Sequence, residues 1–84
     1  AAPDGDPLPL HDHVRRLVER IPRIAEVRSV RSRAGASGVV FAEVTVGVSG
    51  STTVADAHAI ADEVEHRIAE ALGASEVVVH IEPA

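Results

Sequence analysis

The chain has 84 residues, the length of one small domain with a thin hydrophobic core. It contains no cysteine, so disulfides, thiolate metal sites and cysteine nucleophiles are excluded, and any bound metal must use nitrogen and oxygen ligands. The formal net charge of -5 argues against a nucleic-acid partner, because phosphate binding requires clustered Lys and Arg. An acidic chain with five histidines instead favours cations as partners.

Residues 1–6 combine proline and glycine with small and acidic residues, which predicts a flexible linker or the remnant of a longer chain. The folded domain is expected to span residues 7–84. No apolar run approaches the roughly 20 residues that a membrane helix needs. We therefore expect this fragment to be soluble and not to insert into a membrane by itself.

The first predicted element is a helix. Asp6 followed by Pro7 is typical of an N-cap residue and a proline at the first helical position. The apolar residues that follow recur at helical spacing, and Pro22 prevents the helix from continuing. We therefore expect a helix from Pro7 to Ile21.

A β-hairpin is expected next. Val27–Arg33 is short and contains β-branched residues and arginines, and residues 34–38 supply turn chemistry before Val39–Val48. The arginines of the first strand are interpreted as a solvated or ion-paired edge. The second strand alternates, so its even-numbered residues should pack on helices and its odd-numbered residues should face the other way.

The second half of the chain predicts a helix and a final strand. Thr53 can cap a helix over Val54–Leu72, and Gly73 is expected to end it in a left-handed conformation. Glu76–Glu82 then alternates as a strand. The buried stripe of the helix is expected to contain Val54, Ala57, Ala61, Val64, Ile68 and Leu72.

The element order α-β-β-α-β predicts an α+β fold. A helix between the last two strands implies a right-handed crossover and a parallel pair, so two helices should cover one face of a three-stranded mixed sheet. This is a ferredoxin-like sandwich that lacks one edge strand. The other face should stay open, and its mixed polarity predicts a homodimer in which two such faces meet. The residues expected there include Val39, Phe41, Glu43, Thr45, Val78, His80 and Glu82.

The final strand carries the best candidate metal ligands. His80 and Glu82 are two residues apart, so they project from the same face of the strand. Two nitrogen and oxygen ligands at this spacing make half a coordination shell for a divalent cation, whereas the alternative interpretation is surface polarity at a chain end. If the last two strands are neighbours, Glu43 adds a carboxylate on that face.

The second helix offers a further candidate, His58, at the flank of its buried stripe. Asp62 lies one turn later, where its carboxylate could orient the imidazole or join the site. The alternative is an interfacial histidine with an acidic neighbour. No site is assigned to the remaining histidines, which are His11, His13 and His66.

Four segments carry a more specific pattern: Val27–Arg33, Val44–Val48, Ala57–Glu65 and Val78–Pro83. The third reads Ala-His-x-x-x-Asp-x-Val-Glu, and the last reads Val-Val-His-Ile-Glu-Pro. Together they resemble the cytosolic C-terminal domain of cation diffusion facilitators, a family of divalent-metal transporters. The resemblance covers most of the chain, and the combination of motifs is more specific than either motif alone.

The resemblance implies a regulatory and dimerisation domain of a proton-coupled transporter, attached to its own transmembrane domain on the cytoplasmic side of a membrane. In such a homodimer, a divalent cation such as Zn, Mn, Fe, Co or Ni binds at the interface and favours a closed pair. The resemblance places His58, His80 and Glu82 at ligand positions of the family. Glu43 falls where some members have an acidic ligand.

Two residues depart from the family pattern. Arg28 and Thr45 stand where zinc-binding members often have histidine, so a full binuclear zinc site is not expected. A sparser site is expected instead, with Glu43 and His80 meeting across the two-fold axis and the other two predicted ligands at its periphery.

The sequence also allows two other classes of function. The first is a ferredoxin-like interaction or small-ligand regulatory module whose histidines are structural. The second is a hydrolase, since His, Asp and Glu are the usual acid-base residues. The chain has no nucleophile elbow, HExxH helix or glycine-rich phosphate loop, and so small a sheet leaves little room for a deep pocket. We therefore expect that it is not an enzyme.

Overall fold

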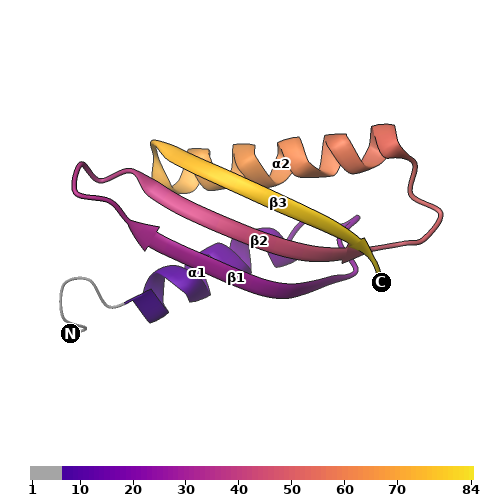
Figure 1. Cartoon of the computed structure of the whole chain (residues 1–84), viewed down its shortest axis with the longest axis horizontal. Helices are drawn as coiled ribbons and strands as arrows, with labels where there is room; N and C mark the ends of the chain where they lie inside the picture. Colours follow the sequence, from indigo (N-terminus) through magenta and orange to yellow (C-terminus); the bar gives the residue numbers. More distant parts are fainter. Residues whose placement is uncertain (1–6) are drawn as a thin grey trace.

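The computed structural model describes residues 7–84, and the predicted linker at residues 1–6 lies outside the described residues. The elements confirm the predicted order (Figure 1): α1 (Pro7–Glu19), β1 (Glu26–Ala34), β2 (Val40–Val48), α2 (Val54–Leu72) and β3 (Ser75–Pro83). Neither helix is both long and apolar enough to cross a membrane.

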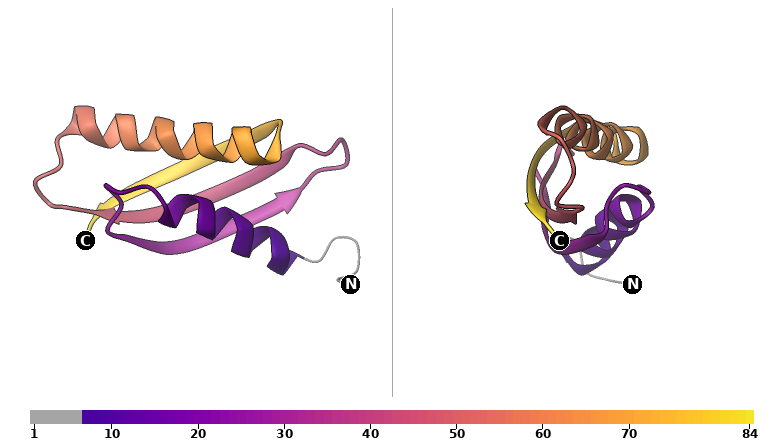
Figure 2. Two further views of the ribbon diagram at one scale, coloured as in Figure 1. Left: turned by 180° about the vertical axis from the view of Figure 1, so that it is seen from behind. Right: turned by 90° about the vertical axis from the view of Figure 1, so that its right-hand side faces the viewer.

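The three strands form one mixed sheet in the order β1-β2-β3. β1 pairs antiparallel with β2, and β2 pairs parallel with β3. The end-on view in Figure 2 shows both helices on the same side of this sheet. The ferredoxin-like α+β architecture is therefore confirmed, and one face of the sheet has no helix over it.

The first helix ends earlier than expected. α1 stops at Glu19, after which the backbone N–H of Ile21 donates to the carbonyl of Val18 at 3.1 Å in a tight turn. Pro22 explains the difference, because a proline disfavours helical geometry in the residue that precedes it. Ile21 is nevertheless buried, so it contributes to the core from outside the helix.

The ends of α2 follow the predicted capping residues. The hydroxyl of Thr53 accepts a hydrogen bond from the backbone N–H of Asp56 at 3.0 Å, which satisfies a free donor of the first turn. Gly73 ends the helix at φ 83°, and its N–H donates to the carbonyl of Ala69 at 2.8 Å. Its ψ of -147° lies outside the left-handed helical region, so this part of the expectation was wrong.

The core lies between the sheet and the two helices. The even-numbered residues of β2 face this layer, as their alternation predicted. The buried hydrophobic residues that form one cluster are Val14, Val18, Ile21, Ile24, Ala42, Val44, Val46, Val48, Ile60, Val64 and Ile68.

The predicted stripe of α2 was wrong at two positions. Ile60 was left out but is only 1% exposed, whereas Val54 was included but is 76% exposed. At about 100° per residue, Ile60 and Ile68 lie on either side of Val64, and that arc is the centre of the buried face. Val54 falls at the edge of the arc and in the first turn of the helix, where it reaches solvent.

Replacing Ile60 with alanine should lower the free energy of unfolding by about 2–5 kcal/mol, because it leaves a cavity in the core. The control Val54→Ala should change it by less than about 0.5 kcal/mol, since that side chain is exposed. Urea denaturation followed by circular dichroism measures both. Equal losses in the two variants would contradict this packing of α2.

Candidate functional site

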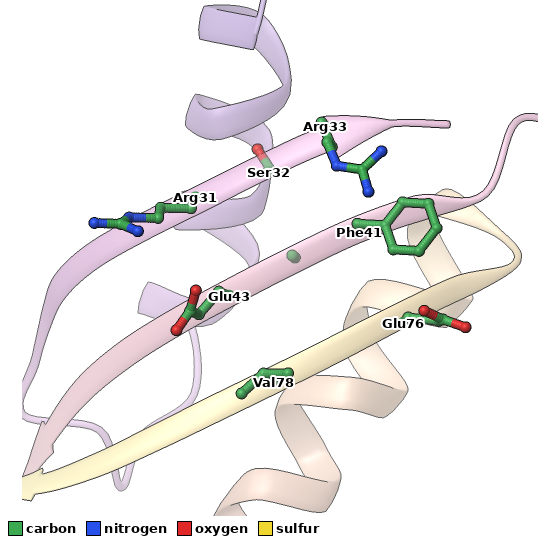
Figure 3. Close-up of a pocket in the computed structure, with 8 residues that line it drawn as sticks. Arg31, Ser32, Arg33, Phe41, Glu43, Glu76 and Val78 are labelled. Atoms are coloured by element: carbon green, nitrogen blue, oxygen red, sulfur yellow. The ribbon is translucent and has the colours of Figure 1, made fainter. Parts of the chain in front are cut away.

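The open face of the sheet carries side chains from all three strands. Figure 3 shows a shallow depression on this face, with two arginines on β1 and carboxylates on β2 and β3. Its volume is about 330 Å³, and it is lined by Arg31, Ser32, Arg33, Phe41, Ala42, Glu43, Glu76 and Val78. The sequence had predicted that Phe41, Glu43 and Val78 share this face.

Both apolar and charged groups are exposed in the depression. Val78 is 55% exposed, which is unusual for a large aliphatic residue in the middle of a strand. The guanidinium carbon of Arg33 lies 4.3 Å from the centroid of the Phe41 ring, a cation–π contact that holds both side chains against the sheet. The face is thus neither a core surface nor an ordinary solvated one.

The sheet brings two predicted ligands into direct contact. In the register of the parallel pair, Thr45 lies opposite His80 and Glu43 lies opposite Val78, so Glu43 and His80 are diagonal neighbours on the open face. The His80 Nε2 lies 2.7 Å from the Glu43 Oε2. The side chains are 51% and 46% exposed, respectively, so water and dissolved ions reach both.

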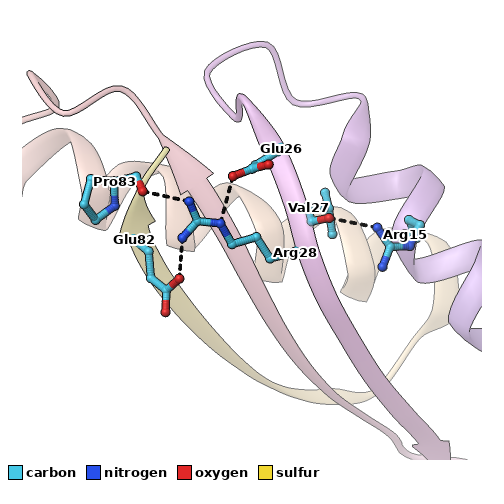
Figure 4. A network of polar contacts seen from close by, with 6 residues as sticks. All are labelled: Arg15, Glu26, Val27, Arg28, Glu82 and Pro83. Atoms are coloured by element: carbon cyan, nitrogen blue, oxygen red, sulfur yellow. Dashed lines mark hydrogen bonds and ion pairs between the residues drawn. The ribbon is translucent and has the colours of Figure 1, made fainter.

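Glu82 shares the open face but has a different partner. One carboxylate oxygen accepts a hydrogen bond from Arg28, whose guanidinium also donates to Glu26 and to the Pro83 carbonyl (Figure 4). The carboxylates of Glu82 and Glu26 raise the pKa of Arg28 above its ordinary value, because they stabilise its charged form. The interpretation of Arg28 as an ion-paired strand residue is therefore confirmed.

The sequence did not reveal why Arg28 reaches so far. A β-bulge shifts the register between Val27 and Ser29, so Arg28 is the extra residue in its strand. A bulge redirects its side chain, and here the side chain extends toward β3. No local signal marks this position, because the bulge is defined only by the pairing with β2.

His58 lies on the other layer of the molecule. It is exposed on α2 beside a groove whose lining includes Asp62, Val79 and Ile81. Val79 and Ile81 point to the helix side of β3, whereas His80 points to the open side. Within one chain, the structure therefore brings Asp62 near His58 but separates His58 from His80.

Two of the remaining histidines, His66 and His11, contact other residues of the chain. His66 pairs with Glu70 on the solvent side of α2 at 2.9 Å. The His11 Nε2 lies 3.0 Å from the Ser32 carbonyl oxygen. Across residues 7–84, no group of three or more His, Asp or Glu side chains is arranged to hold a metal ion.

Comparison with known proteins gives a family match over nearly the whole chain. The family model described as "Cation efflux protein, cytoplasmic domain" matches residues 8–84. The search of curated proteins found no matching sequence.

Solved structures share the fold. The CTD of the magnetosome protein MamB from Desulfamplus magnetovallimortis BW-1 is 26% identical, with a TM-score of 0.77 over 87% of this chain and 90% of that one. A nickel form of the MamM CTD is 23% identical, with a TM-score of 0.80 over 92% and 98% of the two chains. A cadmium form is 24% identical, with a TM-score of 0.82 over 94% and 99%.

The contact between Glu43 and His80 is expected to add little to stability. His80→Ala should change the free energy of unfolding by less than about 1 kcal/mol, because exposed ion pairs are screened by water and cost side-chain entropy. Ile68→Ala, in the core, should cost about 2–5 kcal/mol in the same urea experiment. If His80→Ala lowered the free energy of unfolding as much as Ile68→Ala does, the Glu43–His80 contact would have a structural role.

Proposed function

Because the chain belongs to the family of cation efflux protein cytoplasmic domains, we propose that it is the regulatory and dimerisation domain of a proton-coupled divalent-metal transporter. It lies on the cytoplasmic side of the membrane as a homodimer, joined to its own transmembrane domain. Metal binds where the open faces of two copies meet. The observation that carries this proposal is the exposed Glu43–His80 pair on a face that has no helix over it.

The pair offers half of a coordination shell. One imidazole nitrogen and one carboxylate provide two ligands, whereas a zinc-like ion takes about four. A two-fold axis through the open face would supply the same two side chains from the second copy. Ligand atoms at about 2.1 Å from a tetrahedral ion lie about 3.4 Å apart. The present 2.7 Å between Nε2 and Oε2 would thus have to open only slightly.

The open face also suits a second copy of the chain. It exposes Val78, which gains by removal from water, and the half-buried Phe41 lies on the same face. Arg31 and Arg33 lie on β1, and carboxylates lie on β2 and β3. A surface that carries separated charges of both signs can complement itself under a two-fold rotation.

The expected ligand is a divalent cation that accepts nitrogen and oxygen donors. Zn, Mn, Fe, Co and Ni all fit one imidazole and one carboxylate per chain. The nickel and cadmium forms of the MamM CTD support this class of ion. Arg28 and Thr45 provide no imidazole, which favours one shared site of four ligands over a binuclear zinc centre.

Metal would act on the dimer by linkage. Two copies that join at one face can sample open and closed arrangements, and an ion held by both copies binds only the closed one well. The ion therefore shifts the population toward the closed pair. This change in the cytoplasmic dimer is the signal passed to the transmembrane domain.

The central test is a metal titration of the homodimer. The chain has no cysteine, so Ser51→Cys provides one spin-label site per copy. Double electron–electron resonance measures the distances between the two labels. Adding Zn²⁺ or Ni²⁺ should shorten the mean distance and narrow the distribution. Glu43→Ala and His80→Ala should each raise the metal concentration needed for a half-maximal response at least ten-fold, because each removes two of the four ligands.

His66→Ala is the matched control, since it removes an exposed imidazole that pairs with Glu70 on α2. Its response should equal that of the parent protein. An unchanged response in both site variants would mean that metal binds elsewhere and would end the proposal. A parent protein that shows no response to metal would support the interaction-module interpretation.

We also retain a peripheral role for His58, with Asp62 orienting its ring. Because His58 lies on the helix side of β3, its metal contact would be separate from the central one. His58→Ala should therefore lower the number of metal ions per dimer in native mass spectrometry, while the label-distance response persists. The same His66→Ala control should leave the number unchanged, and an equal number in His58→Ala would remove this residue from the ligand set.

A further inference from the structure

A row of residues at one end of the open face surrounds a positive charge. Glu26 on β1, Gly47 on β2 and Glu82 on β3 lie side by side in the register of the sheet. Arg28 emerges from the bulge on β1 and extends across this row, as Figure 4 shows. The guanidinium therefore lies between two carboxylates that come from opposite edges of the sheet.

All three guanidinium nitrogens are engaged. Nε donates to Glu26 Oε1 at 2.8 Å, Nη1 to Glu82 Oε1 at 2.5 Å, and Nη2 to the Pro83 carbonyl at 2.8 Å. Two carboxylates and a backbone carbonyl are the oxygen donors that hard divalent cations use. Arg28 thus occupies a cradle whose chemistry also suits a metal ion.

Gly47 makes this arrangement possible. A Cβ at that position would lie 2.8 Å from Glu26 Cγ and 2.9 Å from its Oε1. Those distances are too short for real side-chain contacts, so Glu26 could not remain where it is if Gly47 carried a side chain. The cradle therefore depends on residues of all three strands and on the absence of a side chain in the middle strand.

The geometry points to Arg28 as a tethered cation that fills the oxygen site of Glu26, Glu82 and Pro83 and keeps Glu82 out of the metal-binding set. This inference rests on the proposed function, because it concerns which residues of the open face take the metal. Glu82 is then a metal ligand only when Arg28 is removed. On this face, metal binding in the parent protein is confined to the Glu43–His80 pair.

Electrostatics explains why a dissolved ion does not displace Arg28. The guanidinium stays protonated under all ordinary conditions, and its attachment to β1 gives it a high local concentration at the carboxylates. An incoming divalent ion would have to break three hydrogen bonds and then remain beside the displaced positive charge. Both effects lower the affinity of Glu82 for metal.

The test is Mn²⁺ binding by the whole chain, measured by isothermal titration calorimetry and native mass spectrometry. Mn²⁺ is chosen because carboxylate and carbonyl oxygens suit it. Arg28→Gln should bind one additional Mn²⁺ per copy, or bind Mn²⁺ at least ten-fold more tightly than the parent protein. The added replacement Glu82→Gln should abolish this gain.

Arg67→Gln is the matched control. It removes one positive charge and frees one carboxylate, that of Glu63, but both residues lie on α2 and not on the open face. It should produce no gain. If Arg67→Gln gains as much as Arg28→Gln, or if the gain survives Glu82→Gln, the effect is general charge and the inference is overturned.

A second variant decides the matter even if Arg28→Gln folds poorly. Glu82→Gln alone, in the parent background, should leave Mn²⁺ number and affinity unchanged, because Arg28 already holds that carboxylate. A loss of Mn²⁺ binding there would show that Glu82 is a ligand beside Arg28 and would overturn the inference. A folded Arg28→Gln that binds as the parent does would overturn it too.

These results are separable from the central test. If Glu43→Ala and His80→Ala lose their metal response but Arg28→Gln shows no gain, only the tethered-cation inference fails. If Arg28→Gln gains an ion through Glu82 but the parent protein shows no response through Glu43 and His80, only the proposed function fails.

Discussion

The parallel pairing of β2 with β3 is the constraint on which the rest of the molecule depends. It requires a crossover through α2, and a right-handed crossover places that helix on the same side of the sheet as α1. The other side is left without cover. The same pairing sets a register in which Glu43 and His80 become diagonal neighbours, so the open face and its polar pair have one structural cause.

A domain of 84 residues has only enough chain to cover one face of its sheet. The proposed two-fold pairing would use the other face, because it would bury the exposed Val78 of both copies at once. It also doubles every polar pair that lies near the axis. One imidazole and one carboxylate are too few ligands in a single chain. The proposed pairing would turn them into four, which would tie metal occupancy to the arrangement of the dimer.

The two acidic clusters of the open face differ in how their negative charge is balanced. Near the middle, Glu43 contacts the imidazole of His80, a group that can itself bind a metal ion. At the end, Glu26 and Glu82 face a guanidinium that has no lone pair and remains charged. Because Arg28 neutralises Glu26 and Glu82, we expect a dissolved cation to bind more favourably at Glu43 and His80. An arginine, as well as the ligands themselves, can therefore determine where on the face a metal ion binds.

The sequence by itself determined the order of elements, the cap at Thr53, and the side of the sheet to which each strand residue points. These depend on local chemistry: turn and capping residues, and a period of two along a strand. It also identified Glu43, His80 and Glu82 as neighbours on one face, through alternation and the expected strand order.

Only the tertiary structure decided which of these groups meet. The bulge at Arg28 and the register of the parallel pair depend on contacts between strands far apart in the chain, and no local pattern encodes them. The packing of α2 on the sheet also decides which arc of its apolar face is buried, so that Ile60 lies in the core and Val54 reaches solvent. Faces follow from local periodicity, whereas partners follow from long-range packing.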